Sequence, residues 1–287
     1  MNPKKLTFNT KTTINCSGKL LDLSSPRIMG ILNLTPDSFF DGGKYKNEKQ
    51  IANRIENIIS EGADIIDLGA VSTRPGANLL NYDEELHRLD FALNFIQKYF
   101  KQIIVSVDTF RADVAQKVVA DFEVDIINDI SGGTMDKNMY ETVAKLNVPY
   151  IMMHIQGTPA IMQVAPNYQD VVKEIITFFV EKVEKLKKLG VNDIIIDPGF
   201  GFGKTLEHNY IILKNLTLFK MLELPILVGL SRKSMIYKLL SLSPEDVLPE
   251  SLALNSLALN NGANILRVHD VKETQRMLKI FEKYSNS

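Results

Sequence analysis

The chain has 287 residues, with 33 basic and 34 acidic side chains, and this near balance argues against a nucleic-acid partner or an anionic membrane surface. Its single cysteine, Cys16, excludes an internal disulfide framework and suits a reducing, cytoplasmic compartment. The first residues lack the apolar stretch of a signal peptide, and no apolar run approaches the roughly 20 residues needed to span a bilayer. We therefore expect a soluble globular protein.

Eight short apolar runs, each followed by a segment of helical period, organise the chain. The runs are 27–33, 64–70, 103–109, 125–131, 149–155, 193–199, 225–231 and 264–270. Their continuous apolar character is typical of parallel strands that are covered on both faces. Amphipathic segments such as 50–62, 113–122 and 171–190 separate them, with Gly62 and Gly190 placed as C-terminal caps of two helices.

Eight strand–helix alternations predict a closed (β/α)8 TIM barrel over residues 27–287. Residues 1–26 are expected to form an N-terminal β-hairpin extension that plugs the bottom of the barrel. No Pro/Gly/Ser-rich linker or shift of composition divides the chain, so we expect a single domain over residues 1–287. A doubly wound open sheet is the structural alternative.

Polar side chains gather where the predicted strands end. They are Asn33, Asp108, Asn128, Asp129, His154, Asp197, Ser231, Arg232, Lys233, Ser234, Arg267, His269 and Asp270. In a barrel enzyme the carboxyl ends of all strands meet at one mouth, where the chemistry takes place. Helix capping or an Asx turn explains Asp129 and Asp270 equally well, but capping alone does not account for polar ends on every strand.

Three familiar binding or catalytic motifs are incomplete in this sequence. The segment 197–205, "DPGFGFGKT", lacks the first glycine of a P-loop, and Lys204 replaces the third glycine of a dinucleotide fingerprint. In "GLSRK" Lys233 stands where a nucleophile elbow needs glycine. The four histidines do not have metal-ligand spacing, and one cysteine cannot build a zinc site. The predicted mouth therefore suits a polar, planar ligand together with an anion.

A series of motifs, taken in order, resembles the dihydropteroate synthase family over about residues 27–271. The motifs are "IMGILNLTPDSFFDGG", "STRPGA", "SVDTF", "INDISGG", "MHIQGTP", "DPGFGFGKT", "VGLSRKS" and "RVHDV". The resemblance implies a pterin-binding barrel that condenses 6-hydroxymethyl-7,8-dihydropterin diphosphate with p-aminobenzoate. The products are 7,8-dihydropteroate and diphosphate, in folate biosynthesis. It also implies inhibition by sulfonamides, which mimic p-aminobenzoate, and a homodimer formed through outer helices.

The resemblance assigns the pterin to Asp108, Asn128, Asp197 and Lys233, with Met153 against the face of the ring. The carboxylate of Asp197 can accept hydrogen bonds from an amino group and a ring N–H that lie side by side on the pterin. Asn128 can donate and accept, Asp108 can accept at the other edge, and Lys233 brings a cation to the pterin carbonyl. These types of side chain fit the edge of a pterin.

The leaving diphosphate needs its charge neutralised. Arg267 and His269, two residues apart, are expected to grip the phosphate oxygens together. The resemblance gives Asn33 as the protein ligand of Mg²⁺, which also binds the diphosphate. The aromatic amine is neutral at pH 7 and needs no strong base, so the reaction is expected to proceed by SN1-like loss of diphosphate and capture of a pterin-methyl cation.

The segment from Thr35 to Gly43, together with the "STRPGA" loop, is expected to close over the mouth. The resemblance lines the p-aminobenzoate pocket with Phe39, Pro75 and Phe202, places Thr73 and Arg74 nearby, and gives the carboxylate of the substrate to Ser234 and Lys233. Phe40 has a second interpretation, as a simple anchor of its loop. Val71 departs from the Glu that is common at this place in the family.

Two other functions compete with the synthase. A pterin-barrel methyltransferase would bind methyltetrahydrofolate in a similar pocket, but it needs neither a diphosphate grip nor an aromatic closing loop. A non-catalytic pterin-binding barrel would be expected to have lost the diphosphate and loop residues. The segments "TPDSFFDGG", "SRKS" and "RVHD" favour the synthase over both.

Overall fold

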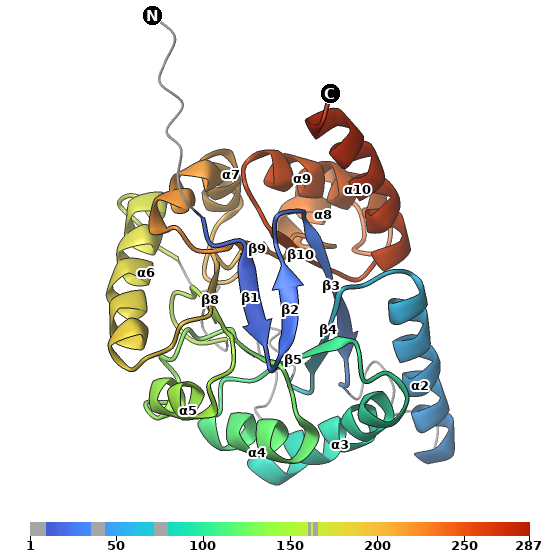
Figure 1. The fold of residues 1–287 in the computed structure, drawn as a ribbon. Helices are drawn as coiled ribbons and strands as arrows, with labels where there is room; N and C mark the ends of the chain where they lie inside the picture. The colour runs from blue at the N-terminus through green and yellow to red at the C-terminus, as the bar shows by residue number, and fades with distance from the viewer. Residues whose placement is uncertain (1–9, 36–43, 72–79, 160–161, 163–165) are drawn as a thin grey trace, which may run out of the picture.

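The structure, a computed structural model, describes residues 10–35, 44–71, 80–159, 162 and 166–287. Eight strands stand at its centre: β3 (Arg27–Asn33), β4 (Ile65–Gly69), β5 (Ile104–Asp108), β6 (Ile126–Asp129), β7 (Tyr150–Met153), β8 (Ile194–Asp197), β9 (Leu227–Val228) and β10 (Ile265–Val268). A ring of helices surrounds them (Figure 1): α2 (Lys44–Ser60), α3 (Tyr82–Tyr99), α4 (Ala112–Phe122), α5 (Met139–Leu146), α6 (Val171–Lys188), α7 (Leu206–Lys214), η1 (Leu216–Leu222), α8 (Ser234–Leu240), α9 (Leu248–Asn260) and α10 (Val271–Ser285). Within the described part of the chain, no helix is both long and apolar enough to cross a bilayer.

The eight strands are parallel and close on themselves. Strands that follow one another in the chain are neighbours in the sheet, and β10 returns to pair with β3. A bridge between Ile196 and Ile226 joins β8 to the residue before β9. An open doubly wound sheet would instead reverse its strand order at a switch point. The predicted (β/α)8 barrel is confirmed, and the open-sheet alternative is wrong; the single-domain organisation stays a prediction.

Local sequence signals set several helix ends. Gly62 and Gly190, with φ of 97° and 90°, follow the ends of α2 and α6 by two residues, as predicted. Residues with a side chain adopt this left-handed conformation at a cost, so glycine is preferred there. At the opposite ends, the side chains of Asn81 and Asp170 accept backbone N–H groups in the first turns of α3 and α6.

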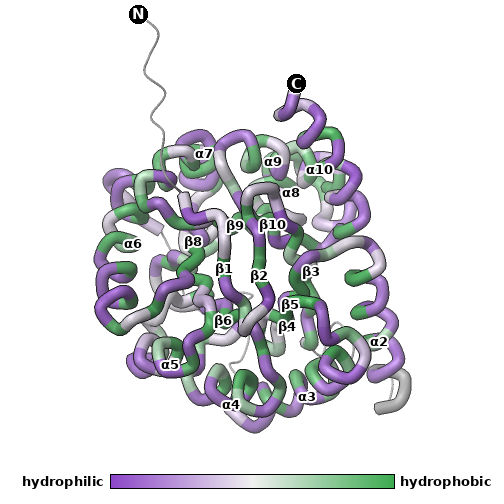
Figure 2. The backbone as a smooth tube through the Cα atoms, viewed as in Figure 1, coloured by the Kyte–Doolittle hydropathy of each residue, from purple (hydrophilic) through white to green (hydrophobic). Residues whose placement is uncertain are grey.

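Each barrel strand buries both of its faces, which explains the continuous apolar runs in the sequence (Figure 2). Outward-facing side chains pack against the helices; they are Ile28, Ile66, Leu68, Val105, Val107, Ile127, Tyr150, Met152, Ile194, Ile196, Val228, Leu266 and Val268. Inward-facing side chains fill the bottom of the barrel with one residue from each strand; they are Met29, Ile65, Ile104, Ile126, Ile151, Ile195, Leu227 and Ile265. We call this second set the bottom layer.

A hairpin of β1 (Thr13–Cys16) and β2 (Lys19–Asp22) lies across the bottom of the barrel (Figure 1). Ile14, Cys16, Leu21 and Leu23 pack directly on the bottom layer. The alternation of buried and exposed residues in β1 follows from the period of two in a strand, which turns one face toward the barrel. The N-terminal hairpin and its plugging role are therefore confirmed.

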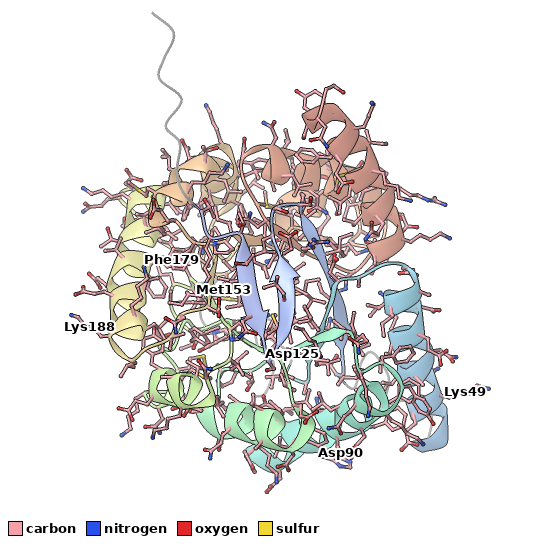
Figure 3. The ribbon with its side chains drawn as sticks, viewed as in Figure 1. Lys49, Asp90, Asp125, Met153, Phe179 and Lys188 are labelled. Atoms are coloured by element: carbon pink, nitrogen blue, oxygen red, sulfur yellow. The ribbon has the colours of Figure 1, made fainter. Side chains whose placement is uncertain are left out.

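An ion pair between the partly exposed Lys19 and the buried Asp125 fastens the hairpin to the barrel. Lys19 Nζ donates to Asp125 Oδ2 at 2.9 Å and to the Ile103 carbonyl at 2.9 Å. Figure 3 labels Asp125 next to the hairpin tip. The Asp125 side chain is 1 % exposed, and burial raises its pKa even though Lys19 and the Val105 N–H stabilise the charge. Asp125 Oδ1 has no hydrogen-bond partner among the described residues.

We expect Lys19→Met to lower the free energy of unfolding by roughly 3 kcal/mol, because it leaves the Asp125 carboxylate buried without its cation. Urea denaturation at pH 7 measures this loss. Lys117→Met is the matched control, since Lys117 pairs with Asp121 on an exposed face of α4 and should cost less than about 0.5 kcal/mol. Equal losses in the two variants would contradict the anchoring role of Lys19.

Candidate functional site at the carboxyl ends of the strands

Above the bottom layer, five of the eight inward-facing positions are polar. Strand side chains alternate, so the residue two places further along each strand points to the same interior. This second layer consists of Ile31, Asp67, Ser106, Asn128, Met153, Asp197, Gly229 and Arg267. A TIM barrel carries its chemistry at the carboxyl ends of its strands, and that is the direction in which the polar layer lies.

The guanidinium of Arg267 joins two carboxylates across this layer. Its Nε donates to Asp67 Oδ2 at 2.7 Å, and its Nη2 lies 2.6 Å from the same oxygen. Nη2 also donates to Asp108 Oδ2 at 3.1 Å. The Asp67 side chain is fully buried, so removing the cation would leave a carboxylate without compensation. Arg267 therefore sits beside Asp108, at the level predicted for the pterin.

Asp67 is a site residue that the sequence analysis missed. Besides Arg267, it accepts a hydrogen bond from Ser106 Oγ at 2.6 Å and contacts from Asn128 Nδ2 at 3.3 and 3.4 Å. A signal was present, because a carboxylate interrupts the apolar run 64–70 two residues after the inward-facing Ile65. Asp67 lies in the middle of β4, whereas the predicted site residues were chosen from the ends of the strands. Asp67 thereby orients Asn128 as well as Arg267.

Burial raises the pKa of Asp108 to about 7; the carboxylate of Asp67 adds to the rise, and Arg267 opposes it. The Asp108 carboxyl group can therefore exchange between its acid and its carboxylate form near neutral pH. In the ionised form it accepts hydrogen bonds only, and in the acid form it can also donate one. This position suits contact with a ligand that has both donors and acceptors.

Asp197 and Lys233 lie on the opposite side of the layer. Asp197 Oδ1 accepts the Gly199 N–H at 2.7 Å, and burial raises the pKa of this carboxyl group while Lys233 lowers it. The Lys233 ammonium donates to the Phe200 carbonyl and lies 4.6 Å from the centroid of the Phe202 ring. Burial lowers the pKa of Lys233 to about 8, although Asp197 favours its charged form. A carboxylate and a cation thus meet beside an aromatic face.

A small apolar cluster provides a wall at the mouth. Met153, 3 % exposed, packs with Phe110, Ile130, Ile155 and Met162, and Phe202, Met135 and Val71 pack against this group. The structure thus brings together Met153 and Phe202, which were predicted to contact different rings of the substrates. Val71 packs against this apolar cluster. The Glu that is common at this position in the family would place a charge there. This wall can support flat, apolar faces of a ligand.

His269 lies one residue beyond β10, at the rim of the mouth. Its backbone N–H donates to Ser231 Oγ at 3.3 Å, and its carbonyl accepts from Arg54 Nη2 at 2.7 Å. Burial and the positive charge of Arg267 lower the pKa of His269 to about 4. The imidazole is therefore neutral at pH 7 and stands among cations, an environment that favours an anionic ligand.

Asn33, at the end of β3, is predicted to bind Mg²⁺. In the sheet it pairs with Gly69, and Gly69 pairs with Asp108. A Cβ on Gly69 would lie 3.5 Å from Asn33 Oδ1 and 3.9 Å from Asp108 Oδ2, so the side-chain oxygens of both residues lie beside this glycine. Within the described ranges, no cluster of three or more Asp, Glu, His or Cys side chains is arranged to hold a metal. These donors fit an ion that prefers oxygen ligands and is bound largely by a phosphate substrate.

Other predicted mouth residues have local roles. Asp129 accepts hydrogen bonds from Ser131, Gly133 and Tyr150, so the Asx-turn explanation holds for it. Asp270 forms a two-pronged ion pair with Arg232. Ser234 begins α8, directly after Lys233, and is half-buried. Phe39, Phe40, Thr73, Arg74 and Pro75, with most of the two closing loops, lie outside the described residues.

Comparisons with known proteins agree on one family. The family model described as "Pterin binding enzyme" matches residues 29–269. The dihydropteroate synthase of Escherichia coli (strain K12) is 43 % identical over 267 residues, covering 92 % of this chain and 94 % of that protein. The dihydropteroate synthase of Haemophilus influenzae is 41 % identical over 273 residues, covering 94 % and 98 %.

A solved structure gives the same result. The Yersinia pestis dihydropteroate synthase, determined as a complex with a sulfonamide drug, superposes with a TM-score of 0.90 at 40 % identity. That match covers 96 % of this chain and 100 % of the Yersinia chain. Family and fold are thus shared over nearly the whole length.

We expect His269→Gln to reduce the acid sensitivity of the fold. The unfolded chain takes up a proton at His269 below about pH 6.5, whereas the folded protein does so only near pH 4, so wild-type stability falls as the pH falls between these values. Between pH 7 and pH 5 the variant should lose about 2 kcal/mol less than wild type in urea denaturation. His87→Gln, on the exposed side of α3, should follow wild type. Parallel curves for His269→Gln and wild type would contradict this assignment.

Proposed function

The chain belongs to the dihydropteroate synthase family, a group of transferases in folate biosynthesis, and we propose in detail how its residues condense 6-hydroxymethyl-7,8-dihydropterin diphosphate with p-aminobenzoate. The observation that carries the proposal is the polar second layer, in which Asp67, Asn128, Asp197 and Arg267 converge inside one barrel, with Asp108 bound to Arg267 one step nearer the mouth. So many buried polar groups are costly unless a polar ligand and water satisfy them. A pterin offers donors and acceptors along its edges.

The pterin lies in the second layer. Asp197 accepts hydrogen bonds from the amino group and the adjacent ring N–H of the pterin. Asn128, held by Asp67, both donates and accepts hydrogen bonds. Asp108 contacts the other edge, and Lys233 donates to the pterin carbonyl. This proposal is supported by the burial of Asn128 and Asp197 and by the ion pair that fixes Asp108. Met153 closes one face of the ring through its contacts in the apolar cluster.

The diphosphate lies toward the rim, at His269. A neutral imidazole among cations can take up a proton when a phosphate group approaches, and it then neutralises the leaving group. Arg267 is shared between Asp67 and Asp108, so it serves the pterin end of the diphosphate rather than the outer phosphate. Asn33 would hold Mg²⁺ together with the diphosphate, and the bound ion would supply further neutralisation of the phosphate charge.

The chemistry is SN1-like. The bond between the pterin methylene carbon and the diphosphate oxygen breaks first, and both electrons leave with the diphosphate. The neutral amine of p-aminobenzoate then attacks the pterin-methyl cation and afterwards loses a proton. Catalysis therefore consists of positioning, charge stabilisation and exclusion of water, and it needs no strong general base.

The p-aminobenzoate ring packs against Phe202 at the mouth, and its carboxylate faces Ser234 and Lys233. Support comes from the ammonium of Lys233, which lies above the Phe202 ring immediately before the first residue of α8. Phe39, Pro75, Thr73 and Arg74 complete this pocket in the proposal. Sulfonamides would occupy the same place, as inhibitors. The Xanthomonas albilineans family member, 36 % identical with a TM-score of 0.89, has a structure with 4-aminobenzoic acid.

The function is tested by incubating the purified protein with the pterin diphosphate, p-aminobenzoate and Mg²⁺. Mass spectrometry should detect dihydropteroate, and EDTA should abolish its formation because the diphosphate loses its counter-ion. Asp197→Ala should remove calorimetric binding of free pterin, while His269→Gln should keep that binding and lose at least tenfold in kcat/KM for the pterin diphosphate. Tight pterin binding without product would instead favour a pterin-barrel methyltransferase or a non-catalytic binder.

We also propose that two copies associate through α9 and α10. A groove of about 790 Å³ between these helices is lined by Leu257, Met277, Ile280, Phe281 and Tyr284, among others. Ile280 and Tyr284 are 75 % and 73 % exposed, an unusual cost for large apolar side chains on one face. Exposed large apolar side chains are also found on α8 and η1, among them Leu239 and Met221. A two-fold homodimer would bury the apolar groove between α9 and α10.

Ile280→Glu should convert the dimer to a monomer in light scattering coupled to size-exclusion chromatography, because it places two charges in the interface. Val180→Glu is the control, since Val180 is an apolar side chain that is 51 % exposed on α6, away from the groove. A monomeric wild type at micromolar concentration would refute the dimer. An unchanged mass for the Ile280 variant would refute this choice of interface.

A cytoplasmic location belongs to the same proposal. Cys16 is the one cysteine of the chain, and its free thiol is buried between the hairpin and the bottom layer. Burial raises the pKa of this thiol to about 12, so it is protonated and unreactive. The protein thus gains no stability from oxidation, as suits a reducing compartment.

A further inference from the structure

Lys204 is a buried cation that the proposed chemistry does not use. Its side chain is 3 % exposed. Its Nζ lies 2.9 Å from the Phe202 carbonyl, 3.2 Å from the His154 carbonyl and 3.1 Å from His154 Nδ1. An ammonium group has three N–H donors, and here each one has an acceptor. Burial lowers the pKa of Lys204 well below its ordinary value and Asp197 opposes this, while the three acceptors around Nζ favour the ammonium form.

The imidazole of His154 is the acceptor in this contact. Burial lowers its pKa well below the ordinary value, and the charge of Lys204 lowers it further, so the ring is neutral at pH 7. Because the ammonium can only donate, Nδ1 accepts and the ring proton is on Nε2. The ring packs edge-on against Phe178, with a centroid separation of 5.0 Å, which fixes its orientation.

The contact joins two loops at the mouth of the barrel. His154 follows β7, whereas Lys204 ends the turn 199–204 that follows β8. The turn lies directly against the β7 side: a Cβ on Gly199 would be 2.0 Å from the His154 carbonyl oxygen, and one on Gly203 would be 2.6 Å from the Gln156 carbonyl oxygen. Both glycines have a left-handed φ, so the turn has little freedom to move without breaking these contacts.

The same turn carries two groups that contact Lys233. The Phe200 carbonyl accepts from the Lys233 ammonium, and the Phe202 ring lies beneath it. Lys204 holds the carbonyl of Phe202 itself. Lys204 therefore holds the backbone of Phe202, while Lys233 contacts its ring.

We propose that Lys204 and His154 form a buried clasp that positions the turn 199–204, and with it Phe202, for binding of the aryl amine substrate. Lys204 is thus a positioning residue for the p-aminobenzoate half of the reaction, which it serves without touching the substrate. The inference rests on the proposed function. It predicts a defect that is confined to one of the two substrates.

The test is a steady-state comparison of Lys204→Met with wild type. Methionine keeps most of the length of the side chain and removes all three donors. The KM for p-aminobenzoate should rise at least tenfold, while the KM for the pterin diphosphate stays within twofold and kcat within threefold. Lys188→Met is the control, because Lys188 pairs with Glu184 on the solvent face of α6 (Figure 3) and should leave both constants unchanged.

A second variant, His154→Leu, removes the ring acceptor and keeps the two carbonyl acceptors. The KM for p-aminobenzoate should again rise, by a smaller factor, while the KM for the pterin diphosphate stays unchanged. This variant tests the positioning role if the Lys204 variant does not fold. A lower melting temperature with unchanged KM values, or equal rises for both substrates, would overturn the positioning role. If the wild-type protein forms no dihydropteroate, both the proposed function and this inference are wrong. If the wild type is active and the variants have unchanged KM values, only this inference is wrong.

Discussion

The guanidinium of Arg267, held between Asp67 and Asp108, is the interaction around which the interior of the barrel is arranged. Charges inside a barrel are tolerated only when each has its partner at hydrogen-bond distance. Arg267 meets both carboxylates, and Asp67 is further satisfied by Ser106 and Asn128. Moving any one of these side chains would leave another unpaired, so the layer has one well-defined arrangement. A ligand therefore meets a preformed polar surface.

Stability and function occupy different levels of the same strands. The bottom layer is wholly apolar and is sealed by the hairpin, which Lys19 ties to the barrel wall through Asp125 and the Ile103 carbonyl. The polar layer lies two residues further along each strand. The apolar contacts below offset the cost of the buried charges above. This division explains why the polar residues cluster toward the carboxyl ends of the strands.

The mouth has two electrostatic regions that match the two parts of the proposed substrate. Asp67, Asp108 and Asp197 lie deep, where donors of a pterin would meet acceptors. His269, Arg54 and Arg232 lie at the rim, where the low pKa of the His269 imidazole reflects both burial and surplus positive charge. Lys233 stands between the regions, beside Asp197 and above Phe202. Separation of charge along the barrel axis thus orients an elongated ligand with an anionic end.

The sequence by itself determined the number and order of the strands, the hairpin and most of the polar residues at the strand ends, because continuous apolar runs and local caps depend only on neighbouring residues. Only the tertiary structure decided which polar groups meet. Asp67 was overlooked because its role needs the closure of β10 onto β3, which brings Arg267 across to it. Asp129 could be assigned to a turn only once Tyr150 and Gly133 were placed around it. Lys204 and His154 are 50 residues apart in the chain, and no local pattern reports a contact that exists only when two loops fold side by side.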